Sequence, residues 1–217
     1  ESCGFQLLTH WYREGLDGDA IFVKKSYFLN EATQSFLNSH KIDEKYKRYY
    51  EPFFKTYYDL EDNKDDSIKE NLKKGCTYEG NIGLIIDRFT KPGSLALDIG
   101  SHIGVHTVTM SRKVGSQGGV IAFEPNKKFY MELLNTLKIN QCENVFPIAK
   151  ALGDAKDQVL LSTDFHHCPQ VIKSDDSCSL AYGSQKPYSG DSVEIITLDS
   201  LNLKNLSLIK MDVENYE

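Results

Sequence analysis

The pattern of apolar and polar positions changes near residue 76, and from there onward short apolar runs alternate with amphipathic stretches. Short apolar runs predict buried strands, and apolar residues three and four apart predict helices. We expect strands over 95–98, 119–123 and 145–149 and helices over 82–89, 104–113 and 127–140. Strands that alternate with helices at this spacing are typical of an α/β fold with a mainly parallel sheet flanked by helices.

The region closest to the C-terminus predicts more strands and one long loop. We expect these strands over 159–162, 193–197 and 206–211. Residues 164–191 are polar and rich in Ser, Gly, Asp and His, a composition typical of a loop. The carboxyl ends of parallel strands meet at one edge of the sheet, and ligands of such folds bind there.

Residues 1–75 differ from the rest of the chain because they are rich in Tyr, Phe and Lys. Aromatic residues recur at helical spacing over 44–58, namely Tyr50, Phe53, Phe54 and Tyr57. We therefore expect a helix there, or two short helices divided by Pro52. These patterns predict an N-terminal helical extension or lid at 1–75 and a second domain at 76–217. Because the chain ends just after the last predicted strand, we expect it to be truncated at its C-terminal end.

Composition narrows the class of protein. The chain has 217 residues and a formal net charge of -6, which disfavours a protein that follows nucleic-acid phosphates. It contains no apolar run long enough to cross a membrane. Its five cysteines are scattered and do not form a disulfide pattern, so we expect a reducing, cytoplasmic location. The spacing of His166, His167, Cys168 and Cys178 does not match a zinc site, and we predict no metal.

Candidate chemistry gathers after the first two predicted strands. Gly100 and Gly104 bracket the turn from the first strand into its helix, where glycine lets the backbone turn sharply and lets a ligand approach. The N–H groups at the start of that helix suit a carboxylate or a phosphate. Glu124 follows the second strand directly, a position that suits the two hydroxyls of a ribose. The glycine turn and Glu124 together indicate a cofactor that contains adenosine.

The turn sequence D-I-G-S-H-I-G distinguishes between two such cofactors. A dinucleotide site needs a middle glycine, but His102 stands at that place. Asp98, two residues before Gly100, is awkward for a pyrophosphate and suits a positive centre. This favours S-adenosylmethionine over NAD.

Five segments in order carry a family resemblance. They are Asp98–Gly104, Ala122–Pro125, Ala151–Gly153, Thr197–Asp199 and Ile209–Glu214. This series resembles the FkbM family of S-adenosylmethionine-dependent O-methyltransferases, over about residues 77–217. The resemblance implies a Rossmann-like class I methyltransferase fold and methyl transfer to a hydroxyl, often on a sugar or a polyketide.

The resemblance also implies roles for individual residues. Asp98, Gly100 and Gly104 would line the methionine end of the cofactor, Glu124 would hold the ribose, and Ala151 would lie near the adenine. Glu79 resembles a family position near the amino-acid end, and Ser101, His102 and Pro125 complete the expected cofactor site. His102, Val105, His106 and Asn215 depart from the residues common in the family, which affects the acceptor site more than the fold.

Catalytic candidates lie at the end of the last predicted strand and just after it. Lys210, Asp212 and Glu214 are two apart, so on an extended segment they share a face at the ligand edge. We expect Asp212 to orient or deprotonate the acceptor hydroxyl and Lys210 to keep Asp212 ionised by pairing with it. His106 and His102 are alternative bases. Tyr182 and Tyr188, in the predicted loop, are candidates for stacking on a sugar.

Four functions remain open on the sequence alone. Methylation of a sugar hydroxyl in a glycan is the first prediction. RNA methylation within the same fold is disfavoured by the acidic balance. The others are a cofactor-binding scaffold without catalysis and an NAD enzyme.

Overall fold

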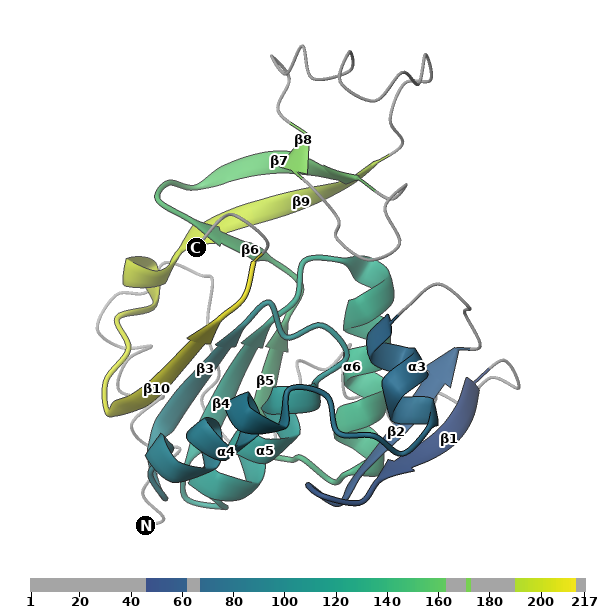
Figure 1. The fold of residues 1–217 in the computed structure, drawn as a ribbon. Coiled ribbons are helices and arrows are strands. Elements are labelled where there is room, and N and C mark those ends of the chain that lie inside the picture. The colour runs from purple at the N-terminus through teal and green to yellow at the C-terminus, as the bar shows by residue number, and fades with distance from the viewer. Residues whose placement is uncertain (1–45, 62–66, 163–170, 173–189, 214–217) are drawn as a thin grey trace.

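The structure is a computed structural model that describes residues 46–61, 67–162, 171–172 and 190–213. Its centre is a four-stranded parallel sheet in the order β10-β3-β4-β5 (Figure 1). The strands are β3 (Leu95–Ile99), β4 (Gly119–Phe123), β5 (Val145–Ile148) and β10 (Leu206–Met211). The strands predicted at these places are confirmed. All of β3 is buried, which explains why its sequence is apolar without alternation.

Three helices cover one face of this sheet. They are α4 (Gly80–Phe89), α5 (Val105–Val114) and α6 (Lys127–Ile139). Met110 of α5 and Leu133 of α6 are fully buried in a cluster with Ala96 and Val120 of the strands. Asn126 caps the N-terminus of α6 by accepting hydrogen bonds from the backbone N–H groups of Lys128 and Phe129.

The opposite face of the sheet packs against a different part of the chain. Leu97, Ile121 and Phe146 are fully buried there, in a cluster with Ile196 and Leu201. Ile196 belongs to β9 (Gly190–Thr197), and Leu201 to the short 3₁₀ helix η3 (Leu198–Leu201). The chain therefore covers this face on its way into β10.

A second sheet stands above the carboxyl ends of the parallel strands (Figure 1). Its order is β6-β9-β7-β8, with β6 (Ala151–Gly153), β7 (Asp157–Ser162) and β8 (Val171–Ile172). β9 pairs parallel with β6 and antiparallel with β7. The strands predicted at 159–162 and 193–197 are thus confirmed, but they belong to this separate sheet.

The helix predicted over 44–58 is wrong. β1 (Tyr46–Glu51) and β2 (Thr56–Glu61) form an antiparallel hairpin instead. Pro52 lies in the turn, and the Glu51 carboxylate accepts hydrogen bonds from the N–H groups of Phe53 and Phe54 at 2.7 Å each. The aromatic spacing has another cause, because Tyr50 and Tyr57 are cross-strand partners with ring centroids 4.8 Å apart.

The hairpin packs on the body through α3 (Ser67–Lys73) and α6. Tyr58 and Leu60 of β2 share a buried cluster with Ile103 and Phe129. The hairpin and α3 therefore share one hydrophobic cluster with the turn after β3 and with α6. The boundary predicted near residue 75 stays a prediction, and residues 1–45 lie outside the described ranges.

A buried ion pair joins α3 to α6. Lys69 Nζ lies 2.7 Å from Glu132 Oε1, and the side chains are 0% and 1% exposed. The ammonium also lies 5.7 Å from the centroid of the Phe129 ring. Removing one charge would leave the other buried without its counter-charge.

We predict that Lys69→Met lowers the free energy of unfolding by about 3–5 kcal/mol. Chemical denaturation measures the change. Lys69→Met combined with Glu132→Leu should recover most of the loss, because no buried charge remains. Asp87→Asn, which removes the partly exposed pair of Asp87 with Lys113, should change the free energy by less than about 1 kcal/mol. A single variant as stable as the wild type would contradict this account.

Candidate functional site

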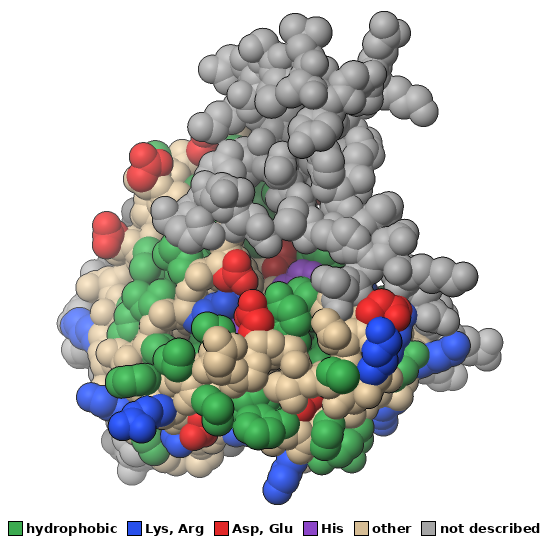
Figure 2. Space-filling model, viewed as in Figure 1, with side chains coloured by type: hydrophobic (Ala, Val, Ile, Leu, Met, Phe, Trp, Pro, Cys, Tyr) green, Lys and Arg blue, Asp and Glu red, His purple; other side chains and the backbone are tan. Residues whose placement is uncertain are grey.

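A cavity of about 850 Å³ lies between the carboxyl ends of the parallel strands and the second sheet. Its floor includes the turn after β3 and the residues after β4, and the N-termini of α4 and α5 contribute to its wall. Val159, Leu161 and Val193 supply an apolar surface from the second sheet. Figure 2 shows acidic side chains and a histidine gathered near the middle of the face viewed.

The turn between β3 and α5 is fixed by backbone contacts. The N–H groups of Gly100 and Ser101 donate to the carbonyl oxygen of Phe123, at 3.0 and 2.9 Å, and the Ser101 hydroxyl donates to it at 3.1 Å. Gly100 has φ +75°, and a Cβ at this position would collide with the backbone carbonyl of Asp212. Glycine is therefore required here by the end of β10 as well as by the sharp turn.

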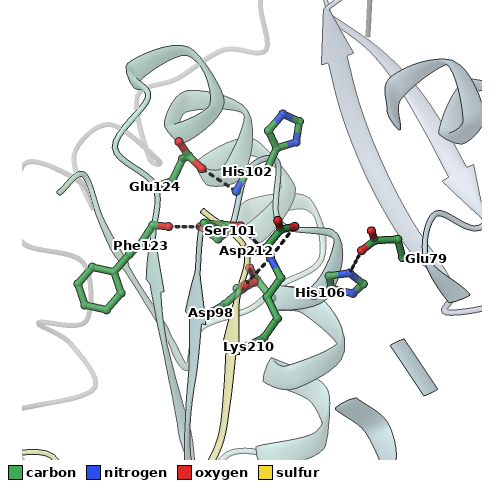
Figure 3. Close-up of polar contacts among 11 residues, drawn as sticks. Glu79, Asp98, Ser101, His102, His106, Phe123, Glu124, Lys210 and Asp212 are labelled. Carbon is green, nitrogen blue, oxygen red and sulfur yellow. Dashed lines mark hydrogen bonds and ion pairs between the residues drawn. The ribbon is translucent and has the colours of Figure 1, made fainter. Parts of the chain in front are cut away.

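His102 sits in the left-handed region, with φ 50°. Its backbone N–H donates to Glu124 Oε2 at 2.8 Å (Figure 3). Its ring centroid lies 3.9 Å from that of Phe129. His is among the residue types enriched in this backbone region. Its position in the turn is thus explained by conformation and packing.

Glu124 is a buried carboxylate at the tip of β4. It is 5% exposed, and Oε1 accepts a second backbone hydrogen bond, from Asn126, at 2.8 Å. Burial raises the pKa of Glu124 to about 7, although the hydrogen bonds from Asn126 and His102 lower it. The site thus holds a carboxylate that ionises near neutral pH, at the position predicted to hold a ribose.

Asp98 lies behind the cavity wall. Its side chain is fully buried, and Oδ2 accepts a hydrogen bond from the Thr107 hydroxyl at 2.5 Å. Oδ1 lies 3.5 Å from Lys210 Nζ. Among the described residues, Asp98 is not part of the cavity lining, and its nearest cation is Lys210.

Lys210 connects the buried carboxylate to an exposed one (Figure 3). Its ammonium donates to the carbonyl oxygen of Gly100 at 2.9 Å and lies 3.6 Å from Asp212 Oδ2. Lys210 and Asp212 both line the cavity, and the Asp212 side chain is 49% exposed. The structure therefore brings together the two residues predicted to pair after the last strand.

Glu79 and His106 form a second polar contact in the cavity lining. His106 Nε2 lies 3.0 Å from Glu79 Oε2, and both residues line the cavity. Glu79 immediately precedes α4, and His106 lies in the first turn of α5. The sequence placed both residues near the ligand but did not predict their contact.

The remaining predicted residues divide into three groups. Pro125 and Ala151 line the cavity. Gly104 does not, because it is buried under Leu133 and begins α5 with φ +89°. Glu214, Tyr182, Tyr188, His166, His167, Cys168 and Cys178 lie outside the described residues. Within the described ranges, no three His, Cys, Asp or Glu residues lie close enough to hold a metal.

The sequence did not predict the second sheet as a wall of the site. Its β7 and β9 strands place Gln158 and Ile195 against the cavity. Lys150, also in the lining, pairs with Glu194 of β9 at 2.9 Å. The apolar alternation of these strands was visible, but their association with the strand ends depends on long-range packing.

Comparison with known proteins agrees with this site. The model of the methyltransferase FkbM domain matches residues 98–217. The chain belongs to this family. The predicted family resemblance is confirmed, and with it S-adenosylmethionine as the cofactor that the family implies. The α/β fold with a parallel sheet flanked by helices agrees with the class I methyltransferase fold.

Solved structures show a partial likeness. A SAM-dependent O-methyltransferase of Thermotoga maritima is 27% identical, with a TM-score of 0.33, over 37% of this chain and 32% of its own. A proposed rRNA methylase of Clostridium thermocellum is 25% identical, with a TM-score of 0.32, over 33% and 39%. The chain thus spans between 32% and 39% of the length of these two structures. No curated protein is similar enough to count as a relative.

The residues present fit an S-adenosyl ligand. Glu124 offers carboxylate oxygens at the strand tip where a ribose is expected, and Gly100 and Ser101 of the neighbouring turn line the same cavity. The cavity volume lies within the range of cofactor sites. Glu124 and the turn at Gly100 and Ser101 are therefore the residues that would hold the cofactor.

Cofactor affinity should depend on pH through Glu124. If Glu124 holds the ribose, its ionised carboxylate would accept hydrogen bonds from the ribose hydroxyls, so affinity should rise as pH rises through about 7. Between about pH 6 and pH 8, calorimetry should show roughly tenfold tighter binding of S-adenosylhomocysteine. Glu124→Gln should bind S-adenosylhomocysteine weakly at both pH values. The control Glu194→Gln should keep the tenfold difference between the two pH values. If Glu124→Gln also keeps this difference, the Glu124 carboxylate is not its source.

Alanine at position 100 should lower the free energy of unfolding more than alanine at position 93, where the backbone conformation is similar but the surroundings are open. Gly93 has φ +73° and no atom within 4 Å of an added Cβ, so Gly93→Ala should cost only about 1–2 kcal/mol of backbone strain. Gly100→Ala adds the collision with the Asp212 carbonyl and should cost at least about 2 kcal/mol more. Equal losses in thermal or chemical unfolding would contradict this.

Proposed function

We propose that the chain is an S-adenosylmethionine-dependent O-methyltransferase that acts on a hydroxyl of a sugar in a glycan. Family membership supports the methyltransferase part. We infer a hydroxyl of a sugar as the acceptor from the charged side chains that line the cavity. The observation on which this inference depends is that most of these side chains are acidic.

Carboxylates dominate the charged groups of this lining. Its described residues include Glu79, Glu124, Asp154, Asp157 and Asp212, but only two ammonium groups, those of Lys150 and Lys210. An anionic cavity attracts a sulfonium and repels phosphates. It therefore supports S-adenosylmethionine with an uncharged polyhydroxyl acceptor, and it disfavours both RNA and a pyrophosphate cofactor such as NAD.

Asp212 is proposed to orient the acceptor. Its half-exposed carboxylate faces the cavity and is suited to accept hydrogen bonds from sugar hydroxyls. Lys210 pairs with Asp212. The ammonium of Lys210 is itself fixed by Asp98 and by the carbonyl oxygen of Gly100. This series of contacts limits the freedom of Asp212, and a fixed acceptor is what an in-line transfer requires.

The chemistry needs little else from the chain. The bound cofactor supplies a methyl group already activated by its sulfonium. The protein has to place the acceptor oxygen in line with that methyl and to exclude water. The apolar side chains of Val159, Leu161 and Val193 support the exclusion of water from the second-sheet side.

Two measurements test this function. Calorimetric titration should show binding of S-adenosylhomocysteine and none of NAD. Transfer of radiolabelled methyl groups from S-adenosylmethionine should then occur to methyl glycosides and not to a structured RNA. Cofactor binding without transfer to any glycoside would overturn the sugar acceptor, and transfer to the RNA would favour the alternative.

Asp212→Asn tests the role of the orienting carboxylate. We predict a fall in kcat/KM of about 10- to 100-fold, with S-adenosylhomocysteine binding changed by less than about threefold. Asp87→Asn on the outer part of α4 serves as the matched control and should leave both unchanged. Unchanged transfer by Asp212→Asn would remove this assignment.

A further inference from the structure

Glu79, at the start of α4, has an unusual backbone conformation and an unusual side-chain contact. It is the N-cap residue of α4, and its side chain makes no capping hydrogen bond. Its backbone is in the left-handed region, with φ 45°, which is uncommon for a residue other than glycine. Such strain is found preferentially at functional sites.

The carboxylate of Glu79 instead reaches the imidazole of His106. Oε2 lies 3.0 Å from Nε2, and the Glu79 and His106 side chains are 35% and 6% exposed (Figure 3). The contact joins the N-termini of α4 and α5, which lie side by side. Glu79 thus links the two helix N-termini and fixes the orientation of a nearly buried ring.

This contact decides which nitrogen of the neutral ring carries the proton. An ionised carboxylate only accepts hydrogen bonds, so Nε2 must donate, and Nδ1 keeps its lone pair. Nδ1 makes no hydrogen bond to any residue in the described part of the chain, and it is not among the buried polar atoms that lack a partner. Because His106 lines the cavity, the geometry leaves a proton acceptor accessible from the site.

The geometry points to His106 as the general base of the transfer, with Glu79 as the residue that positions it. This inference rests on the proposed function. The acceptor hydroxyl gives its proton to His106 Nδ1 as its oxygen forms a bond to the methyl carbon. The carbon–sulfur bond breaks, and the products are a methyl ether, S-adenosylhomocysteine and an imidazolium. Glu79 stabilises that imidazolium through Nε2, and Asp212 orients a neighbouring hydroxyl.

Substitutions test the two roles separately. His106→Gln should lower kcat for transfer to methyl glycosides by about 100-fold or more, with the Kd of S-adenosylhomocysteine within about twofold. Glu79→Ala should lower kcat by roughly tenfold, because the ring loses its orientation. Glu79→Gln keeps an acceptor oxygen and should restore most of the rate. Asp87→Asn, also an acidic residue of α4, should match the wild type.

The tautomer provides a readout that needs no acceptor. A ¹⁵N–¹H correlation spectrum of the imidazole rings should show the His106 proton on Nε2 in the wild type and in Glu79→Gln. In Glu79→Ala the proton should be shared between Nε2 and Nδ1. A proton on Nδ1 in the wild type would overturn the inference, and so would full kcat in a folded His106→Gln. A wild type that binds no S-adenosylhomocysteine would instead overturn the proposed function.

Discussion

The hydrogen bond from the His102 N–H to Glu124 Oε2 is the interaction on which the site depends. It joins the tip of β4 to the turn after β3 across 2.8 Å. The turn cannot move without breaking it, and Glu124 cannot turn outward without leaving the part-buried N–H groups of His102 and Asn126 without this acceptor. One carboxylate thus holds the turn in place and presents the group expected to bind the cofactor ribose.

The same region shows how the fold and the site share residues. Asp212, directly after β10, lies against Gly100, so the end of the strand that carries Lys210 is in contact with the cofactor turn. Asp98 anchors this contact through Lys210. A change in the sheet at this edge therefore affects both cofactor binding and the groups that face the acceptor.

Sequence patterns predicted the parallel sheet and its helices well, because buried strands and amphipathic helices have strong local patterns. They failed for residues 46–61, where cross-strand aromatic pairs imitate helical spacing. Glu124 lines the cavity at the tip of β4, as its place directly after a predicted strand suggested, and its contact with a ribose stays a prediction. The burial of Asp98 behind Lys210 and the contact between Glu79 and His106 depend on how distant elements meet, and no local pattern contains that information.

The most direct test of the central claim is a crystal structure of the chain with bound S-adenosylhomocysteine. The account predicts that the ribose hydroxyls lie within hydrogen-bond distance of the Glu124 carboxylate, with the ligand backbone crossing Gly100 and Ser101. A ligand bound elsewhere, or a ribose that does not contact Glu124, would contradict it.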